Sequence, residues 1–171
     1  MTSCVFCQRS ELEPRVFFDE GAWYALLAAP PFTRGQTILA LKNSAADCPT
    51  SLTIQHLKGL DVAIARVVEF LHRHFQPKDV LIASLRGRDP HIHFHLMPLW
   101  EVEEQEWRQQ SHREKGHLFE FLGYVETKAK LRVKTERMEH GWSEERHRAE
   151  AAVKLQPDVA ALRVLTSYGS A

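Results

Sequence analysis

Three histidines alternate with apolar residues between His91 and Pro98, in the order His-Ile-His-Phe-His-Leu-Met-Pro. Side chains alternate between the two faces of a β-strand, so His91, His93 and His95 share one face. The apolar residues between them occupy the other face and can pack under a helix. Each imidazole has ring nitrogens that need partners, which makes the histidine face poor core material. The alternation therefore predicts a strand whose imidazoles point outward or into a cleft.

Imidazoles in this arrangement suit chemistry near neutral pH. The central His93 can attack phosphorus as a nucleophile, while its neighbours orient it or donate hydrogen bonds to phosphate oxygens or the leaving group. A solvent-facing polar strand that happens to be rich in histidine is one alternative. A three-histidine metal site is another, although a straight strand spreads the three residues over about 13 Å.

The amino-acid composition limits the kind of protein that this chain can be. The 171 residues amount to 19.7 kDa and are 44% hydrophobic, enough for one domain with a real core and perhaps an appendage. Lysine plus arginine and aspartate plus glutamate number 22 each, and a net charge of zero argues against general binding to nucleic acid or anionic membranes. No apolar run is long enough to span a bilayer, and Met1–Cys7 shows no secretory pattern. Three cysteines cannot all be paired in disulfide bonds within one chain. We expect a soluble cytoplasmic protein.

Apolar residues before position 100 predict several strands. A hairpin signal joins Arg15–Phe18 to Trp23–Leu27 around the turn Asp19-Glu20-Gly21. Further strands are predicted at Thr37–Leu41, Val80–Leu85 and His91–Met97.

One long helix is predicted between these strands. Pro49-Thr50-Ser51 indicates its start, with Ser51 or Thr50 as the N-cap. Apolar residues then recur at helical spacing from Leu57 to Phe75, and this stripe needs a sheet to cover.

The histidine alternation resembles the signature of the histidine-triad (HIT) superfamily. Cys4-Val-Phe-Cys7, Val16–Leu27 and Pro31–Thr37 resemble the family's opening, its first hairpin and the turn and strand that follow. Ala83-Ser84-Leu85 and Pro90–Pro98 are similar to a bacterial branch of the family. The resemblance covers roughly residues 1–100.

The resemblance implies an α+β fold for residues 1–100, with a five-stranded antiparallel sheet and two helices, in a protein that commonly forms a homodimer. It implies a hydrolase or transferase that cleaves a phosphoanhydride or phosphoramidate at the α-phosphate of a small nucleotide-type substrate. In that chemistry His93 forms a covalent nucleotidyl intermediate, His95 contacts the phosphate, and His91 orients the middle ring or binds zinc. Catalysis of this type requires no cofactor.

Three positions depart from the family pattern. No carboxylate occurs in Leu26–Pro31, where many members hold the ribose hydroxyls, so nucleoside affinity should fall or the substrate should differ. Many members have Lys-His after the third strand, whereas here Lys42 is followed directly by Asn43. The loop before the triad carries arginines in place of an asparagine or glutamine. We expect Ser84 or one of Arg86 and Arg88 to hold the phosphate; the two arginines are either an anion clamp or ordinary solvated turn residues.

The Cys-x-x-Cys pair of Cys4 and Cys7 has the spacing of two zinc ligands, which alone is half a site. The resemblance adds that some prokaryotic members complete the site with a histidine after the third strand and with the first triad histidine. That third-strand histidine is absent here, but Cys48 lies a few residues beyond. We expect Cys4, Cys7, Cys48 and His91 to form a structural zinc site; three free cysteines are the alternative.

Residues 101–171 lie beyond the family's common core and are charge-rich, which predicts a helical extension packed on the domain or on the dimer partner. Gly116 and Gly141 indicate breaks, and Pro157 the start of a last short helix. Trp107 either lines the active-site mouth or packs the extension onto the domain. We expect His147 on the surface.

Three functional hypotheses follow from the residues and the resemblance. The first is a HIT-type hydrolase or transferase. The second is a binder of a phosphorylated ligand that retains the scaffold without turnover. The third is a metalloprotein in which the triad itself is a catalytic metal site.

Overall fold

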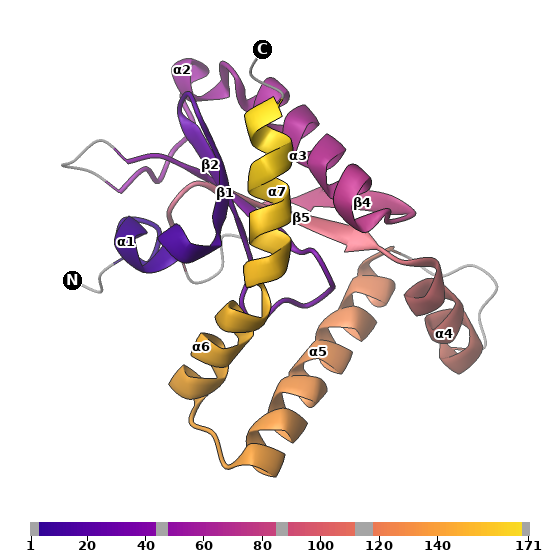
Figure 1. The fold of residues 1–171 in the computed structure, drawn as a ribbon. Coiled ribbons are helices and arrows are strands. Elements are labelled where there is room, and N and C mark those ends of the chain that lie inside the picture. The colour runs from indigo at the N-terminus through magenta and orange to yellow at the C-terminus, as the bar shows by residue number, and fades with distance from the viewer. Residues whose placement is uncertain (1–3, 44–47, 85–88, 112–117, 169–171) are drawn as a thin grey trace.

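The computed structural model describes residues 4–43, 48–84, 89–111 and 118–168 (Figure 1). At its centre is one five-stranded sheet in the order β1-β2-β3-β5-β4, with every neighbouring pair antiparallel. The strands are β1 Val16–Glu20, β2 Trp23–Leu27, β3 Thr37–Leu41, β4 Asp79–Ala83 and β5 His93–Leu99. The predicted α+β class and five-stranded antiparallel sheet are confirmed.

The predicted hairpin forms, with a turn slightly later than expected. β1 continues to Glu20, so Gly21 and Ala22 make the connection to β2. Gly21 has a φ of +53°, in the left-handed region that glycine adopts without steric cost.

The long helix begins later than the sequence indicated. Thr53, and not Thr50 or Ser51, accepts the capping hydrogen bond, and it caps only the one-turn helix α2, Ile54–Leu57. The left-handed backbone of Gly59 then separates α2 from the main helix α3, Leu60–Phe75. Besides α3, the described residues before position 100 form only one-turn helices: α1 Arg9–Leu12, the 3-10 helix Glu13–Arg15 and α2. Helix α3 is therefore the long helix of this part of the chain.

The main core lies between α3 and one face of the sheet. Helix α3 buries residues at intervals of three and four, among them Ala63, Val67 and Leu71. They pack with inward-facing strand residues such as Leu39 and Leu96, which are fully buried. This packing fixes β5, the strand that carries the histidines.

Within its described residues, 101–111 and 118–168, the extension forms α4 Glu101–Ser111, α5 Leu118–His140, α6 Glu144–Lys154 and α7 Gln156–Tyr168. Gly141, with a φ of +62°, separates α5 from α6 as predicted, and Pro157 lies in the first turn of α7. Gly116 lies outside the described residues. Trp107 packs against Phe121 and Val125, which fits the packing alternative for this tryptophan. No helix in the described part of the chain is long and apolar enough to cross a membrane.

Helix α7 covers the outer strand β1 and lies beside α3 (Figure 1). Arg163 Nε donates to the Val16 oxygen at 2.7 Å, and Thr166 Oγ1 donates to the Phe17 oxygen at 3.1 Å. Val159 and Leu162 enter the main core. The helix thus supplies both apolar packing and donors for an edge strand that would otherwise expose its carbonyls.

Replacing Leu162 with alanine should destabilise the whole fold, because the side chain is fully buried in the main core. Such a change costs about 2–5 kcal/mol. Urea denaturation measures the loss, with Val164→Ala, at an exposed position on the same helix, as the control expected within about 0.5 kcal/mol of wild type. Equal effects of the two variants would contradict the packing of α7 described above.

Candidate functional site

The triad histidines lie at the beginning of β5, between β3 and β4. His93 pairs with Ala40 of β3, and His95 lies beside Ile38 of β3. His91 immediately precedes the strand and is completely buried, while His93 is nearly buried and His95 half-buried. The outward or cleft-facing position predicted for all three rings therefore fails for His91. Its ring faces three cysteines, whereas His93 and His95 line a cleft.

A backbone carbonyl fixes the tautomer of His91. Its Nε2 lies 2.8 Å from the oxygen of Leu41. A carbonyl oxygen only accepts hydrogen bonds, so Nε2 carries the proton and the Nδ1 lone pair is available on the other side of the ring. Burial lowers the pKa of His91, which favours the neutral ring.

His93 is fixed in the opposite tautomer. Its Nδ1 donates to the main-chain oxygen of His91 at 2.7 Å. The proton therefore lies on Nδ1, and Nε2 keeps the lone pair that a nucleophile needs. Phe6 packs against the rings of both His91 and His93, with centroid separations of 5.2 and 4.7 Å, and so restricts their rotation.

Gln36 orients His95, a role that sequence reasoning missed. The side-chain oxygen of Gln36 accepts from the backbone N–H of Phe32 at 2.6 Å, which directs the amide nitrogen towards His95 Nδ1, 3.2 Å away. Because the amide nitrogen only donates, His95 Nδ1 accepts and Nε2 carries the proton. Burial, with a contribution from His93, lowers the pKa of His95 to about 4, so the ring is neutral at pH 7. No spacing motif marks Gln36; its burial beside the triad identifies it.

The structure brings together all four predicted metal ligands. His91 Nδ1 lies 3.5 Å from the Sγ atom of Cys4, 3.6 Å from that of Cys7 and 3.4 Å from that of Cys48. All four ligand atoms lie within 4.8 Å of one another. A tetrahedral zinc ion, with its usual bond lengths, would hold the nitrogen about 3.5 Å from each sulfur and the sulfurs about 3.8 Å from one another. The donor set and its spacing fit zinc.

The three thiols are mutually unfavourable as anions. Burial and hydrogen bonds with Cys4 and Cys7 raise the pKa of Cys48 to about 12, and burial also raises the pKa of Cys7. Crowded thiolates repel one another unless a cation lies between them, and a bound metal ion reverses this preference. The hydrogen bond from His91 Nε2 to Leu41 is also the outer-shell contact that orients histidine ligands in metal sites.

His93 and His95 line a cleft of about 760 Å³, within the range of small-ligand sites. Leu12 and Arg15 lie along it, and Ala28 occupies the neighbourhood where many family members place a carboxylate. Lys130 of α5 and Arg148 of α6 also line the cleft. No local pattern indicates that these two extension residues lie near the triad.

Of the predicted phosphate-binding residues, only Ser84 lies within the described part of the chain. Ser84 follows β4, and its hydroxyl donates to the main-chain oxygen of His93 at 3.3 Å, so it lies beside the triad strand. Arg86 and Arg88 lie outside the described residues.

His147 is not a surface residue as expected. It is buried between α6 and α5, and its Nε2 lies 3.0 Å from a carboxylate oxygen of Glu136. The apolar pattern of the isolated helix gives no sign of this contact, because the partner lies on another helix.

Comparison with known proteins identifies relatives by structure alone. No family model matches the sequence, and no curated protein does. A HIT-like protein from Bartonella henselae has a TM-score of 0.51 at 16% identity, covering 59% of this chain and 83% of its own. A HIT family protein from Bacillus anthracis has a TM-score of 0.50 at 19% identity, with coverage of 58% and 74%.

A zinc-bound histidine triad family protein from Mycobacterium smegmatis has a TM-score of 0.50 at 21% identity, covering 78% of this chain and 97% of its own. At 16–21% identity, these likenesses concern the fold. The chain has the fold of the histidine-triad proteins.

Proposed function

We propose that this protein is a HIT-type nucleotide hydrolase or transferase that cleaves a phosphoanhydride or phosphoramidate at a nucleoside α-phosphate. The observation that carries the proposal is the pair of opposed tautomers in the cleft. His93 presents an unprotonated Nε2, and the neighbouring His95 presents a protonated one. Their rings lie 5.1 Å apart between centroids, close enough to act on one phosphate. A nucleophile beside a neutral hydrogen-bond donor suits attack on phosphorus.

The reaction would proceed in two displacements. The Nε2 lone pair of His93 attacks the α-phosphorus, a P–N bond forms, and the bond to the leaving group breaks with its electrons on the departing atom. A departing amine takes a proton from water. The hydrogen bond from His95 Nε2 stabilises the charge on a phosphate oxygen. Water then attacks the phosphorus, the P–N bond to His93 breaks, and nucleoside monophosphate leaves.

Replacing His93 with alanine should abolish turnover, because it removes the attacking nitrogen, and should leave the fold intact, because the backbone pairing of β5 with β3 does not depend on this side chain. The purified protein is mixed with a panel of adenylated and guanylated compounds, and monophosphate release is measured by chromatography. Intact mass should detect a nucleotidyl adduct on the wild type and none on the variant. His72→Ala, at an exposed position on α3, is the control.

Unchanged hydrolysis in the His93 variant would refute the mechanism. Calorimetric binding without any product, across the panel and for the wild type, would favour the alternative of a binder without turnover. The absence of a carboxylate at Ala28 is the feature that would explain such an outcome.

Gln36→Glu tests the role of the His95 tautomer. A glutamate at this position can still accept from Phe32, but it presents an acceptor to His95 Nδ1 and so draws the ring proton away from Nε2. We expect kcat to fall by about 100-fold with the fold retained. Nitrogen NMR of the histidine rings should report the switched tautomer. The exposed Gln55→Glu serves as the control, and an unchanged kcat alongside a switched tautomer would rule out this role.

We also propose that Cys4, Cys7, Cys48 and His91 hold a structural zinc ion. Four protein ligands complete a tetrahedral shell, which is the composition of structural sites. When bound, the ion would supply charge compensation for the thiolates and would cross-link the N-terminal segment to the start of β5. Through Phe6, which lies between Cys4 and Cys7 in the sequence, this cross-link would also hold the packing against His93.

Metal analysis of the purified protein should find about one zinc per chain, released by a strong chelator with a fall in Tm, because metal binding is coupled to folding. Cys7→Ser and Cys48→Ser should each reduce the zinc content, whereas His93→Ala should retain it. Zinc lost from the His93 variant and kept by the cysteine variants would instead support a catalytic metal at the triad.

A further inference from the structure

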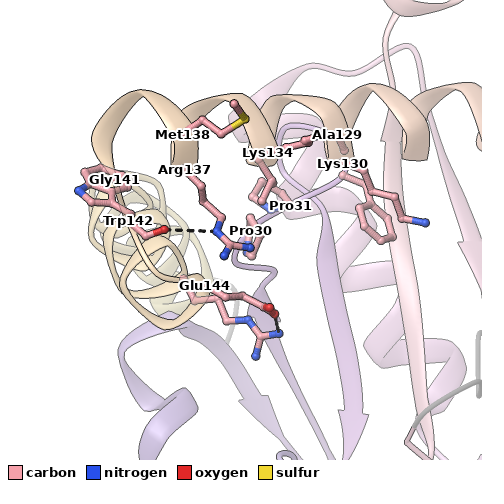
Figure 2. A pocket seen from close by; sticks show the side chains of 13 residues that line it. Pro30, Pro31, Ala129, Lys130, Lys134, Arg137, Met138, Gly141, Trp142 and Glu144 are labelled. Carbon is pink, nitrogen blue, oxygen red and sulfur yellow. Dashed lines mark hydrogen bonds and ion pairs between the residues drawn. The ribbon is translucent and has the colours of Figure 1, made fainter.

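A second cavity of about 630 Å³ lies between α5, α6 and the Pro30–Pro31 segment (Figure 2). Most of its lining residues belong to the extension, and Pro30, Pro31 and Phe32 complete the wall. Figure 2 shows Arg137 reaching from α5 towards Pro30, with Trp142 near the turn between the two helices and Glu144 on α6.

This cavity adjoins the triad cleft. Both are lined by the same five residues, which are Pro30, Phe32, Lys130, Glu144 and Arg148. The triad cleft alone has the volume of a complete small-ligand site. A molecule whose nucleotide part fills the cleft can therefore extend into the second cavity with the part that lies beyond the scissile bond.

The walls of the cavity are largely apolar. Pro31, Phe32, Val133, Met138 and Trp142 all contribute to them. Proline rings and an indole offer flat surfaces on which a planar group can stack. The preferred occupant therefore contains an apolar ring.

The charged groups of the cavity are mainly cationic. Lys130, Lys134, Arg137 and Arg148 line it, against the single carboxylate of Glu144. Lys130 and Arg148 each form an ion pair with a glutamate one helical turn away, so part of their charge is balanced.

Lys134 and Arg137, one turn apart on α5, are better placed for an added anion. Among the described residues Lys134 has no ion-pair partner. Arg137 Nε donates to the main-chain oxygen of Trp142 at 3.4 Å, which holds the guanidinium in place while its terminal nitrogens have no partner in the described part of the chain. A fixed guanidinium beside a lysine favours a carboxylate or phosphate group.

We propose that this cavity binds the leaving group of the substrate, and that the preferred leaving group is an apolar ring with an acidic substituent. The proposal rests on the nucleotidyl transfer proposed above. The ring lies against Trp142 and Pro31, and the acidic substituent lies near Lys134 and Arg137. Arg148, at the junction of the two cavities, faces the part of the substrate next to the scissile bond. The extension thus selects the substrate that His93 attacks.

Three adenosine 5′-phosphoramidates that share one ring test the proposal. Their leaving amines are tyramine, tyrosine and tyramine O-phosphate. Tyramine carries no acidic group beyond the phenol, tyrosine adds a carboxylate, and tyramine O-phosphate adds a phosphate. The wild type should cleave at least one acidic compound with a kcat/KM about tenfold or more above that of the tyramine compound. If the tyrosine compound is cleaved faster, the cavity prefers a carboxylate, and if the tyramine O-phosphate compound is cleaved faster, it prefers a phosphate. This preference should weaken at high salt.

Lys134→Gln should reduce the preference to less than about threefold, whereas Arg148→Gln, at the junction of the two cavities, should lower kcat/KM for all three compounds alike; both variants should keep the wild-type Tm. Arg73→Gln is a matched control for Arg148, because both arginines pair with a glutamate four residues earlier at nearly equal exposure, 59% and 61% for one pair and 60% and 62% for the other. Lys58→Gln matches Lys134, since both are exposed lysines without an ion-pair partner among the described residues. Both controls should keep the wild-type preference.

The outcomes separate this proposal from the enzymatic one. Cleavage of all three compounds at similar rates, or a preference that survives in Lys134→Gln, overturns the leaving-group site and leaves the enzymatic proposal intact. Cleavage of none counts against the enzymatic proposal, and calorimetry with the same uncleaved compounds then decides the site. Tighter binding of an acidic compound that is lost in Lys134→Gln supports an acidic-ring site; equal or absent binding overturns it.

Discussion

Two hydrogen bonds from imidazole rings to backbone carbonyls determine the chemistry of this cleft. The oxygen of Leu41 accepts a hydrogen bond from His91 Nε2, and the oxygen of His91 accepts one from His93 Nδ1. Neighbouring rings on one strand are thereby held in opposite tautomers, one with its lone pair towards the cysteines and one with its lone pair available for attack. The pairing of β3 with β5 and the packing of α3 keep both carbonyls in place. Rigid backbone thus sets the proton positions on which a nucleophile depends.

The cysteine cluster and the triad are parts of one arrangement. His91 belongs to both, since its ring faces the cysteines and its carbonyl orients His93. Phe6 connects them a second time, because it lies between two of the cysteines and packs on the His93 ring. On the other side of the triad, Gln36 gives His95 the complementary proton position through a bond anchored on the backbone of Phe32.

The sequence predicted the features that depend on local periodicity. Alternation specified β5 and the shared face of its histidines, and cysteine spacing with the family resemblance grouped Cys48 with His91. Prediction from the sequence failed where a contact joins distant segments. The buried pairing of His147 with Glu136 and the approach of Lys130 and Arg148 to the cleft arise from how α5 and α6 pack, which no local pattern encodes. The start of α3 was misplaced because the left-handed Gly59 interrupts an otherwise continuous apolar stripe.

The covering of β1 by α7 has a consequence for the order in which the chain can complete its fold. The carbonyls of Val16 and Phe17 receive their donors from residues that are synthesised almost 150 positions later. On a ribosome the early hairpin therefore emerges with an open edge and keeps it until α7 has been made. Throughout that interval the edge can pair with strands of other nascent chains. The last helix thus closes the edge that the first strand leaves open.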